Sequence, residues 1–253
     1  MGAVNMNLSG YTREEINIGQ SSSRVYRCQK GDSVLYLKTA PIADLEPEYE
    51  KLLWLNGKLP VPQVKHWKTE NGTAHLLLTE AAGEMLTDPA ADMLRLPYAT
   101  SVKILADALQ TLQAIDITAC PLNDNLEIRL AKALHNIETG QVDTSDWDDD
   151  HDFTSPMELY NWLTANKPPH EELCFAHGDF TPENVFADGE KPTCYIDLGG
   201  CGIADKWRDI ACCVRSISYD TDDPCYVDQL FSHLQIAPNW TKIKYYNLLD
   251  ELH

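Results

Sequence analysis

Two kinds of hydrophobic spacing divide the chain. Before about residue 80, short apolar or alternating runs are separated by turn residues, which is typical of strands. This pattern predicts strands over residues 16–18, 25–28, 34–38 and 75–79, and one helix over residues 46–56 that Gly57 ends. Further along, the apolar residues have helical spacing. We expect helices over residues 97–119, 126–139, 156–166, 205–218, 225–234 and 241–253.

Short strands interrupt the helical part. Residues 174–176 are an apolar run, and residues 185–187 and 193–196 flank a turn-forming Asp-Gly-Glu-Lys segment, which predicts a hairpin. Residues 80–83 form a short connection between the strand-rich and helix-rich parts. We therefore expect an α+β fold, with a strand-rich N-terminal part (residues 1–80), a connection (81–84) and a mostly helical C-terminal part (85–253).

Charge is distributed unevenly along the chain. The 253 residues include 20 Lys and Arg against 39 Asp and Glu, so the formal net charge is -19. Residues 1–83 hold nine of each kind, so residues 84–253, with 11 basic and 30 acidic residues, carry the whole imbalance. Such a field favours solubility, repels nucleic acid and anionic membranes, and attracts cations. We expect no nucleic-acid or membrane partner.

Composition excludes several other classes of protein. A 43% share of hydrophobic residues excludes a disordered chain. No apolar run approaches the roughly 18–20 residues of a membrane span, and residues 1–8 lack the pattern of a signal peptide. The eight cysteines form no CxxC pair, which argues against a zinc site. We expect reduced thiols in a cytoplasmic protein.

The candidate chemistry is concentrated in one segment. Residues 177–184 have the sequence His-Gly-Asp-Phe-Thr-Pro-Glu-Asn, and Asp197 follows Asn184 by 13 residues. Phosphoryl transfer requires a carboxylate that orients the attacking hydroxyl and oxygen ligands that hold Mg²⁺ against nucleotide phosphates. Asn184 enters the expected hairpin and Asp197 leaves it, so we expect both at the same end of the ribbon. Asp179 supplies the remaining carboxylate.

The N-terminal part carries a matching half. Lys38 ends a strand, and Glu48 lies on the apolar stripe of the following helix, where an unpaired carboxylate is costly. We infer a Lys38–Glu48 ion pair whose ammonium reaches nucleotide phosphates, with Glu46 and Glu50 as alternatives to Glu48. Ser21, in a turn between two strands, is a candidate contact to the terminal phosphate.

Further stretches accompany these motifs at residues 25–27, 35–38, 53–62, 196–199, 204–211, 214–217 and 242–253. Together they resemble the aminoglycoside 3'-phosphotransferase (kanamycin kinase) family, a bacterial antibiotic-resistance branch of the protein-kinase-like fold. The resemblance covers nearly the whole chain. It implies a bilobal protein-kinase-like fold, with an antiparallel N-terminal lobe, a hinge and a mostly helical C-terminal lobe. It also implies phosphorylation of an aminoglycoside hydroxyl, with the 3'-hydroxyl as the expected acceptor, by ATP or GTP and Mg²⁺. It also implies a cationic small-molecule partner and a monomer or homodimer.

The resemblance assigns roles to the matched positions. Lys38 would contact the α- and β-phosphates with Glu48 as its partner, Tyr36 would stack near the adenine, and the backbone of Ala81 would bond to the base. In the second part, Asp179 would be the catalytic carboxylate. Asn184 and Asp197 would be the magnesium ligands, and Asp209 would brace the catalytic loop.

The resemblance also implies that carboxylates of the second lobe hold the ammonium groups of the substrate, with Arg215 orienting some of them. The matched positions are Asp146, Asp148, Asp149 and Asp150 of an acidic run, Asp220, Asp250, Glu251 and the terminal carboxylate at His253. Three positions depart from the family pattern and leave the drug range open: Gly200 replaces a common Arg, Tyr219 a common carboxylate, and His253 an aromatic hydrocarbon ring.

Two other functions compete with this interpretation. The first is a kinase of another small molecule on the same fold, such as a macrolide, choline or a sugar. The second is a catalytically inactive binding module, against which the intact Lys38, Asp179, Asn184 and Asp197 argue. Protein kinase activity is disfavoured, because no A-P-E sequence follows Asp197.

Overall fold

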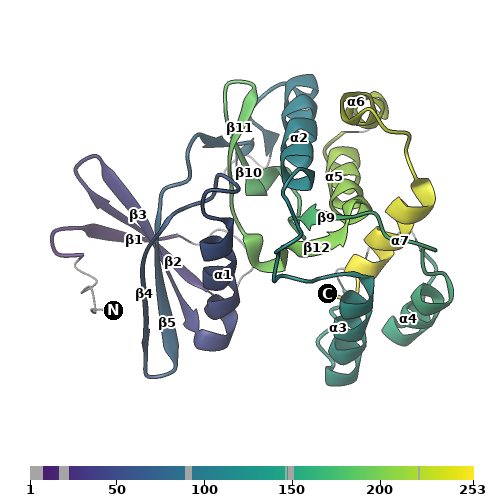
Figure 1. The fold of residues 1–253 in the computed structure, drawn as a ribbon, viewed down its shortest axis with the longest axis horizontal. Coiled ribbons are helices and arrows are strands. Elements are labelled where there is room, and N and C mark those ends of the chain that lie inside the picture. Colours follow the sequence, from purple (N-terminus) through teal and green to yellow (C-terminus); the bar gives the residue numbers. More distant parts are fainter. Residues whose placement is uncertain (1–7, 17–22, 89–92, 146, 148–150, 222) are drawn as a thin grey trace. The chain divides into compact units, whose positions relative to one another are not determined.

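A computed structural model describes residues 8–16, 23–88, 93–145, 147, 151–221 and 223–253 (Figure 1). The chain divides into two compact units. The first comprises Met1–Arg95 and Glu183–Gly199, and the second comprises Leu96–Pro182 and Gly200–His253. This division differs from the expected lobes, because the first boundary follows Arg95 and the segment 183–199 groups with the N-terminal strands.

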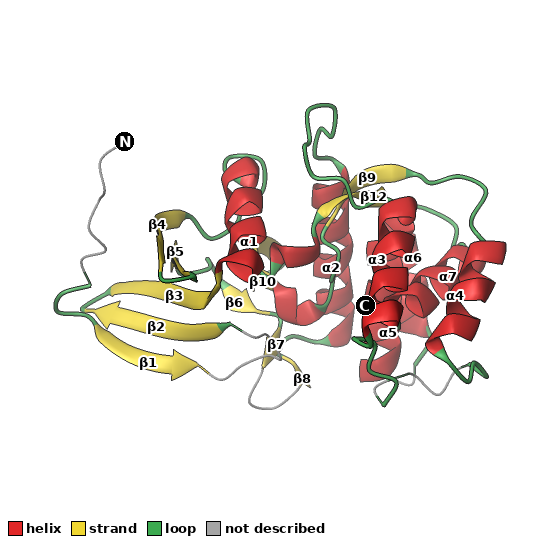
Figure 2. Ribbon diagram, turned by 90° about the horizontal axis from the view of Figure 1, so that it is seen from below, coloured by secondary structure: helices red, strands yellow, loops and turns green. Residues whose placement is uncertain are grey.

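The first unit is built on a five-stranded antiparallel sheet with the order β1-β2-β3-β5-β4 (Figures 1 and 2). Its strands are β1 (Thr12–Ile16), β2 (Arg24–Lys30), β3 (Ser33–Pro41), β4 (Val64–Glu70) and β5 (Thr73–Thr79). Helix α1 (Ile42–Leu55) follows β3 directly and buries Leu45, Leu52 and Leu55. The helix packs against β3, β4 and β5.

A second, three-stranded sheet of this unit joins the hairpin to the connection after β5. Its order is β11-β10-β6, with β6 (Glu84–Met85), β10 (Val185–Asp188) and β11 (Lys191–Tyr195), while β7 (Thr87–Asp88) pairs with β8 (Met93–Leu94). The Tyr195 N–H donates to the Pro60 carbonyl (3.0 Å), and the Thr193 hydroxyl donates to the Ala82 carbonyl (2.6 Å). These bonds explain why the hairpin groups with the N-terminal strands.

The second unit is mostly helical, as expected. Its helices are α2 (Tyr98–Gln113), α3 (Leu126–Thr139), α4 (Pro156–Ala165), α5 (Lys206–Asp220), α6 (Cys225–Leu234) and α7 (Trp240–Asp250). One short antiparallel pair, β9 (Leu173–Ala176) with β12 (Gly202–Asp205), leads into α5. Within the described residues, no helix is both long enough and apolar enough to cross a membrane.

Several predicted elements have different bounds in the structure. The ranges 126–139 and 225–234 are confirmed, and the first of them is capped by Asn125 and Gly140. The helix expected over 97–119 was too long, because it ends at Gln113 and Asp116 then accepts the Thr118 N–H in a turn. β4 and β12 were not predicted. The first strand spans Thr12–Ile16, so Ile16 of the predicted range 16–18 is confirmed as strand, while residues 17 and 18 lie outside the described residues. The residues of this strand before Ile16 are exposed and lack an apolar signature.

A buried ion pair anchors the start of α5 to α7. The Lys242 ammonium donates to Oδ2 of Asp205 (2.7 Å), and the Tyr246 hydroxyl donates to the same oxygen (3.0 Å). Asp205 is 1% exposed and Lys242 is 4% exposed. Burial and the Asp205 charge raise the pKa of Tyr246, so the phenol stays a donor. The other oxygen of Asp205 caps α5 by accepting the Trp207 N–H (3.2 Å).

We predict that Lys242→Met destabilises the protein strongly, because it leaves the Asp205 charge buried without its cation. The expected loss in the free energy of unfolding is about 3–5 kcal/mol. Lys206→Met is the matched control: its ammonium pairs with Glu172 at a more exposed site, and its loss is expected to be about 0–1 kcal/mol. Urea denaturation measures both, and equal losses would contradict the assignment.

Candidate active site

The loop after β9 exposes one carboxylate between buried neighbours. Asp179 is exposed, while His177 and Phe180 are fully buried and their rings meet edge to face at 6.1 Å. Asp209 of α5 accepts the N–H of His177 at Oδ2 (2.6 Å) and the N–H of Gly178 at Oδ1 (2.9 Å). The expected bracing contact of Asp209 is therefore confirmed, and it holds the backbone on the N-terminal side of Asp179.

Gly178 is the one position of this loop that requires glycine. Its φ is +92°, a conformation that L side chains rarely adopt. A Cβ atom there would lie 2.2 Å from the carbonyl oxygen of Gly200. The loop therefore lies next to the backbone that precedes β12. The position of Asp179 depends on this approach, which is possible only because residue 178 has no side chain.

Asn184 and Asp197 meet at one end of the hairpin, as predicted. Val185 pairs with Tyr195, and just beyond this pair the Ile196 N–H donates to the Asn184 carbonyl (3.1 Å). Asp197 follows directly in a left-handed conformation (φ 56°). Asn184 is buried and Asp197 is exposed.

These two side chains fit a magnesium ion that takes further ligands from phosphates and water. Both offer oxygen donors, which Mg²⁺ prefers, and one or two protein ligands are usual when a nucleotide supplies the rest. Among the described residues, no group of three or more His, Cys, Asp or Glu side chains could hold a metal by itself. Asp179 belongs to the other unit, and its convergence with Asn184 and Asp197 stays a prediction.

The predicted ion pair on the N-terminal side is present. The Lys38 ammonium donates to Oε1 of Glu48 at 2.7 Å, and the two side chains are 22% and 12% exposed. Glu46 and Glu50, the alternative partners, are exposed on α1. The structure therefore selects Glu48, which faces β3 from the buried side of the helix.

A further contact of α1 was not predicted. The Lys51 ammonium donates to the carbonyl of Gly199, so α1 is tied both to β3 and to the segment that follows Asp197. Of the other predicted nucleotide contacts, Tyr36 on β3 and Ala81 after β5 are both half-buried. Ser21 lies outside the described residues. The roles of these three residues stay predictions.

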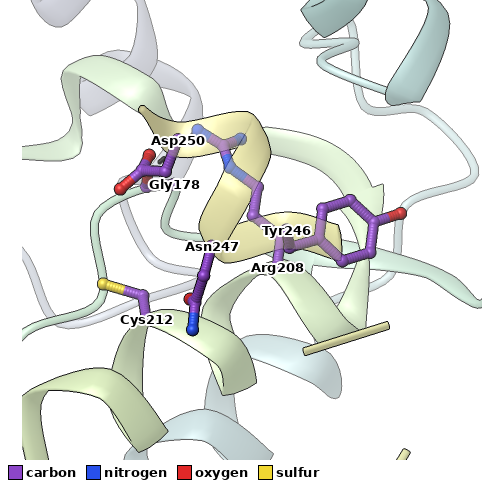
Figure 3. Close-up of a pocket in the computed structure, with 6 residues that line it drawn as sticks. All are labelled: Gly178, Arg208, Cys212, Tyr246, Asn247 and Asp250. Carbon is purple, nitrogen blue, oxygen red and sulfur yellow. Dashed lines mark hydrogen bonds between the residues drawn. The ribbon is translucent and has the colours of Figure 1, made fainter. Parts of the chain in front are cut away.

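The C-terminal end of α7 carries one of the predicted substrate carboxylates between two arginines. Arg215 donates to Oδ2 of Asp250 (2.6 Å), and Nη2 of Arg129 lies 3.5 Å from Oδ1. The expected pairing of Arg215 with a carboxylate of this group is thus confirmed. A small pocket beside Asp250 is also lined by Gly178, in the loop that precedes Asp179 (Figure 3). The other residues that line it are Arg208, Cys212, Tyr246 and Asn247.

The remaining predicted substrate residues are placed mainly by backbone contacts. The Tyr98 hydroxyl donates to the Asp220 carbonyl (2.7 Å), and the indole N–H of Trp147 donates to the Glu251 carbonyl (3.0 Å). His253 donates its N–H to the Asp250 carbonyl (3.0 Å). The bond from Trp147 to Glu251 places one residue of the acidic run, Trp147, beside the C-terminal end of α7. The carboxylates of that run lie outside the described residues: Asp146, Asp148, Asp149 and Asp150.

Comparisons with known proteins place the chain among phosphotransferases. The model of the phosphotransferase enzyme family matches residues 12–246. An aminoglycoside 3'-phosphotransferase of Enterococcus faecalis is 40% identical over 242 residues, which cover 92% of this chain and 90% of that protein. A crystal structure of an aminoglycoside-3'-phosphotransferase of type VIII is 28% identical, with a TM-score of 0.83 over 96% of this chain and 94% of the other.

A more distant solved structure shares the fold. The aminoglycoside phosphotransferase APH(3'')-Id from Streptomyces rimosus, in complex with ADP and streptomycin, is 23% identical, with a TM-score of 0.79. The match covers 95% of this chain and 92% of that one. Together with the type VIII structure, it agrees with the α+β kinase-like fold expected from the sequence motifs.

We predict that Asp209→Ala loosens the loop that carries Asp179. The substitution leaves the two buried N–H groups of His177 and Gly178 without acceptors, at about 1–3 kcal/mol for each group in the free energy of unfolding. Asp228→Ala, at an exposed position in the first turn of α6, is the control and should change stability little. Urea denaturation compares them, and an Asp209 variant as stable as the control would refute the bracing role.

Proposed function

The chain belongs to the aminoglycoside 3'-phosphotransferases of the phosphotransferase enzyme family, and we propose that it transfers the terminal phosphoryl group of a nucleoside triphosphate to a hydroxyl of an aminoglycoside. The expected acceptor is the 3'-hydroxyl, and the expected donor is ATP, with GTP as the alternative. The observation that carries the proposal is the braced loop that exposes Asp179. Phosphorylation would make a bacterial host resistant to the antibiotic.

In the proposed mechanism, catalysis comes mainly from placement and charge neutralisation. Lys38, held by Glu48, binds the α- and β-phosphates of the nucleotide. Asn184 and Asp197 would hold Mg²⁺, and the ion would supply neutralisation of charge on the phosphate oxygens. Asp179 orients the acceptor hydroxyl and takes its proton as the new oxygen–phosphorus bond forms, and the nucleoside diphosphate leaves.

The charge distribution supports a polycationic acceptor. The excess of 19 carboxylates lies in residues 84–253, and a single exposed ionic contact at 4 Å is worth only about 1 kcal/mol in water, so several must act together. The proposed contacts are the acidic loop with Asp220, Glu251 and the terminal carboxylate at His253. Asp250 also belongs to this set, although its two arginine partners offset its charge.

The wider organisation of the enzyme is part of the same proposal. Residues 81–84 would act as the hinge, with the backbone of Ala81 and the ring of Tyr36 at the adenine and Ser21 at the terminal phosphate. A cytoplasmic location would give the enzyme access to the nucleotide. A monomer or a homodimer is the expected assembly.

The first test is phosphorylation of a defined acceptor. Purified full-length protein is incubated with MgATP and kanamycin or its 3'-deoxy analogue, and the products are examined by phosphorus NMR. We expect one phosphomonoester on kanamycin and none on the deoxy analogue. No turnover with aminoglycosides, together with turnover on a macrolide, choline or a sugar, would instead favour a kinase of another small molecule. Failure to bind MgATP in calorimetry would favour an inactive module.

Asp179→Asn is expected to lower kcat for kanamycin phosphorylation by about 10²–10⁴-fold, because the carboxylate that orients the hydroxyl and accepts its proton is lost. Stability should be unaffected, since Asp179 is exposed. Asp188→Asn, at the exposed end of β10, is the matched control and should keep the wild-type rate. Coupled steady-state kinetics measure both variants, and full turnover by the Asp179 variant would reject its role.

Lys38→Met is expected to lower kcat/KM for ATP by about 10–10²-fold, which corresponds to the loss of a charge-assisted bond of about 1.5–3 kcal/mol. Lys30→Met is the control: its ammonium lies on the neighbouring strand β2 and donates to the Ser9 carbonyl (3.2 Å). ATP titrations at saturating kanamycin separate the two. Equal effects of the two substitutions would argue against phosphate binding by Lys38.

A further inference from the structure

We propose that Arg208 is a positioning residue for Asp179, and that the buried carboxylate of Asp124 is its counter-ion. The inference rests on the proposed function and deepens it. Arg208 lies in the first turn of α5, one residue before Asp209. Its Nη2 donates to the Gly178 carbonyl (2.8 Å), and its Nη1 donates to Oδ2 of Asp124 (2.7 Å). No site role is predicted for either residue from the sequence.

Two neighbouring side chains of α5 form hydrogen bonds with the backbone N–H and the backbone carbonyl of Gly178. Asp209 accepts the N–H of Gly178, and Arg208 donates to its carbonyl oxygen. That carbonyl belongs to the peptide bond that joins Gly178 to Asp179. Figure 3 shows the Arg208 side chain extending so that its guanidinium lies beside Gly178. The orientation of the peptide that leads into Asp179 is therefore determined by α5 rather than by the loop itself.

Burial makes this contact directional and strong. Arg208 is 7% exposed and Asp124 is 5% exposed, so water competes little for either group. Although burial alone raises the pKa of Asp124, the charges of Arg208 and its other basic neighbours lower it overall, so the carboxylate is ionised. An ionised counter-ion at 2.7 Å keeps the guanidinium in place.

The counter-ion is itself fixed by the backbone. The Asp124 N–H donates to the carbonyl of Ile203 (3.0 Å) on β12, the strand that leads into α5. A Cβ atom on Gly202 would lie 3.3 Å from the Asp124 Cβ. The segment before α3 thus packs closely on β12, and Asp124 cannot move away from Arg208 without breaking this packing.

The guanidinium of Arg208 also lies next to Gly200. A Cβ atom at this position would lie 3.4 Å from Nη2 of Arg208, and Nη1 of Arg208 donates to the Gly200 carbonyl (3.3 Å). A long side chain at position 200 would begin against the guanidinium. At Gly200, one of the positions that depart from the family pattern, the adjacent guanidinium is the one that Arg208 supplies from α5.

The test compares Arg208→Met with Lys132→Met. Lys132, on α3, donates to the Oδ1 atom of the same Asp124 carboxylate, but its side chain is 54% exposed. Both substitutions remove a cation from Asp124, whereas only the first removes the donor to Gly178. For full-length enzyme with MgATP and kanamycin, we expect Arg208→Met to lower kcat about 10²-fold, as for a misplaced catalytic group, with both KM values within about twofold. Lys132→Met should keep kcat.

Arg208→Lys keeps the charge in the buried site but loses the planar fork that serves Gly178 and Asp124 at once. We expect it to recover stability lost in Arg208→Met without recovering kcat. The lysine variant also tests the positioning role if the methionine variant does not fold. An Arg208 variant that is folded and has the wild-type kcat would overturn the proposal, as would an equal loss of kcat in Lys132→Met.

A second readout does not depend on the reaction. Hydrogen–deuterium exchange of the peptide that contains residues 177–181, measured without substrates, should be faster in Arg208→Met and unchanged in Lys132→Met. Unchanged exchange in Arg208→Met would overturn the positioning role even if the wild-type enzyme proved inactive on aminoglycosides. Faster exchange together with an inactive wild type would refute the proposed function alone.

Discussion

Three acidic or basic side chains at the start of α5 are buried, and much of the second unit is arranged to pair them. Asp205, Arg208 and Asp209 are 1%, 7% and 2% exposed. An unpaired charge at such sites would be very costly, so each side chain determines where its partner must lie. Asp205 pairs with Lys242 of α7, and Arg208 pairs with Asp124 before α3. Asp209 accepts hydrogen bonds from the backbone amides of the loop. One helical turn thus connects two helices and the loop that carries Asp179.

In the first unit, polar side chains of one helix likewise join separate segments. α1 places Glu48 against Lys38 of β3, and one turn later Lys51 reaches the backbone after Asp197. The helix therefore joins the sheet to the hairpin end where the two candidate magnesium ligands lie. Backbone pairing brings Asn184 and Asp197 to the same end of the hairpin, because Asn184 directly precedes Val185 and Asp197 directly follows Ile196, whose N–H donates to the Asn184 carbonyl. The proposed phosphate-binding groups are thus positioned by local pairing within one unit.

Local signals predicted the elements that have strong local patterns. α3 has an Asn cap, a helical apolar stripe and a Gly end, and its bounds were predicted correctly. The hairpin was predicted from the turn between its strands, and its pairing then implied that Asn184 and Asp197 share one end. β4 was missed because Pro60 and Pro62 indicate a loop and because every residue of the strand is exposed or half-buried. β12 was missed because a run beginning with Gly202 has no strand signature of its own.

The sequence by itself determined the chemical groups and the order in which they occur, because motif spacing and hydrophobic period are local properties. It also placed Glu48 on the buried side of a helix, where a carboxylate needs a cation. Only the tertiary structure decided the pairs that join distant segments. Arg208 and Asp124 are 84 residues apart, and Arg215 and Asp250 are 35 apart. The reason is physical: a charged residue in the sequence shows no sign of whether it will be buried, and burial is what makes a specific partner necessary.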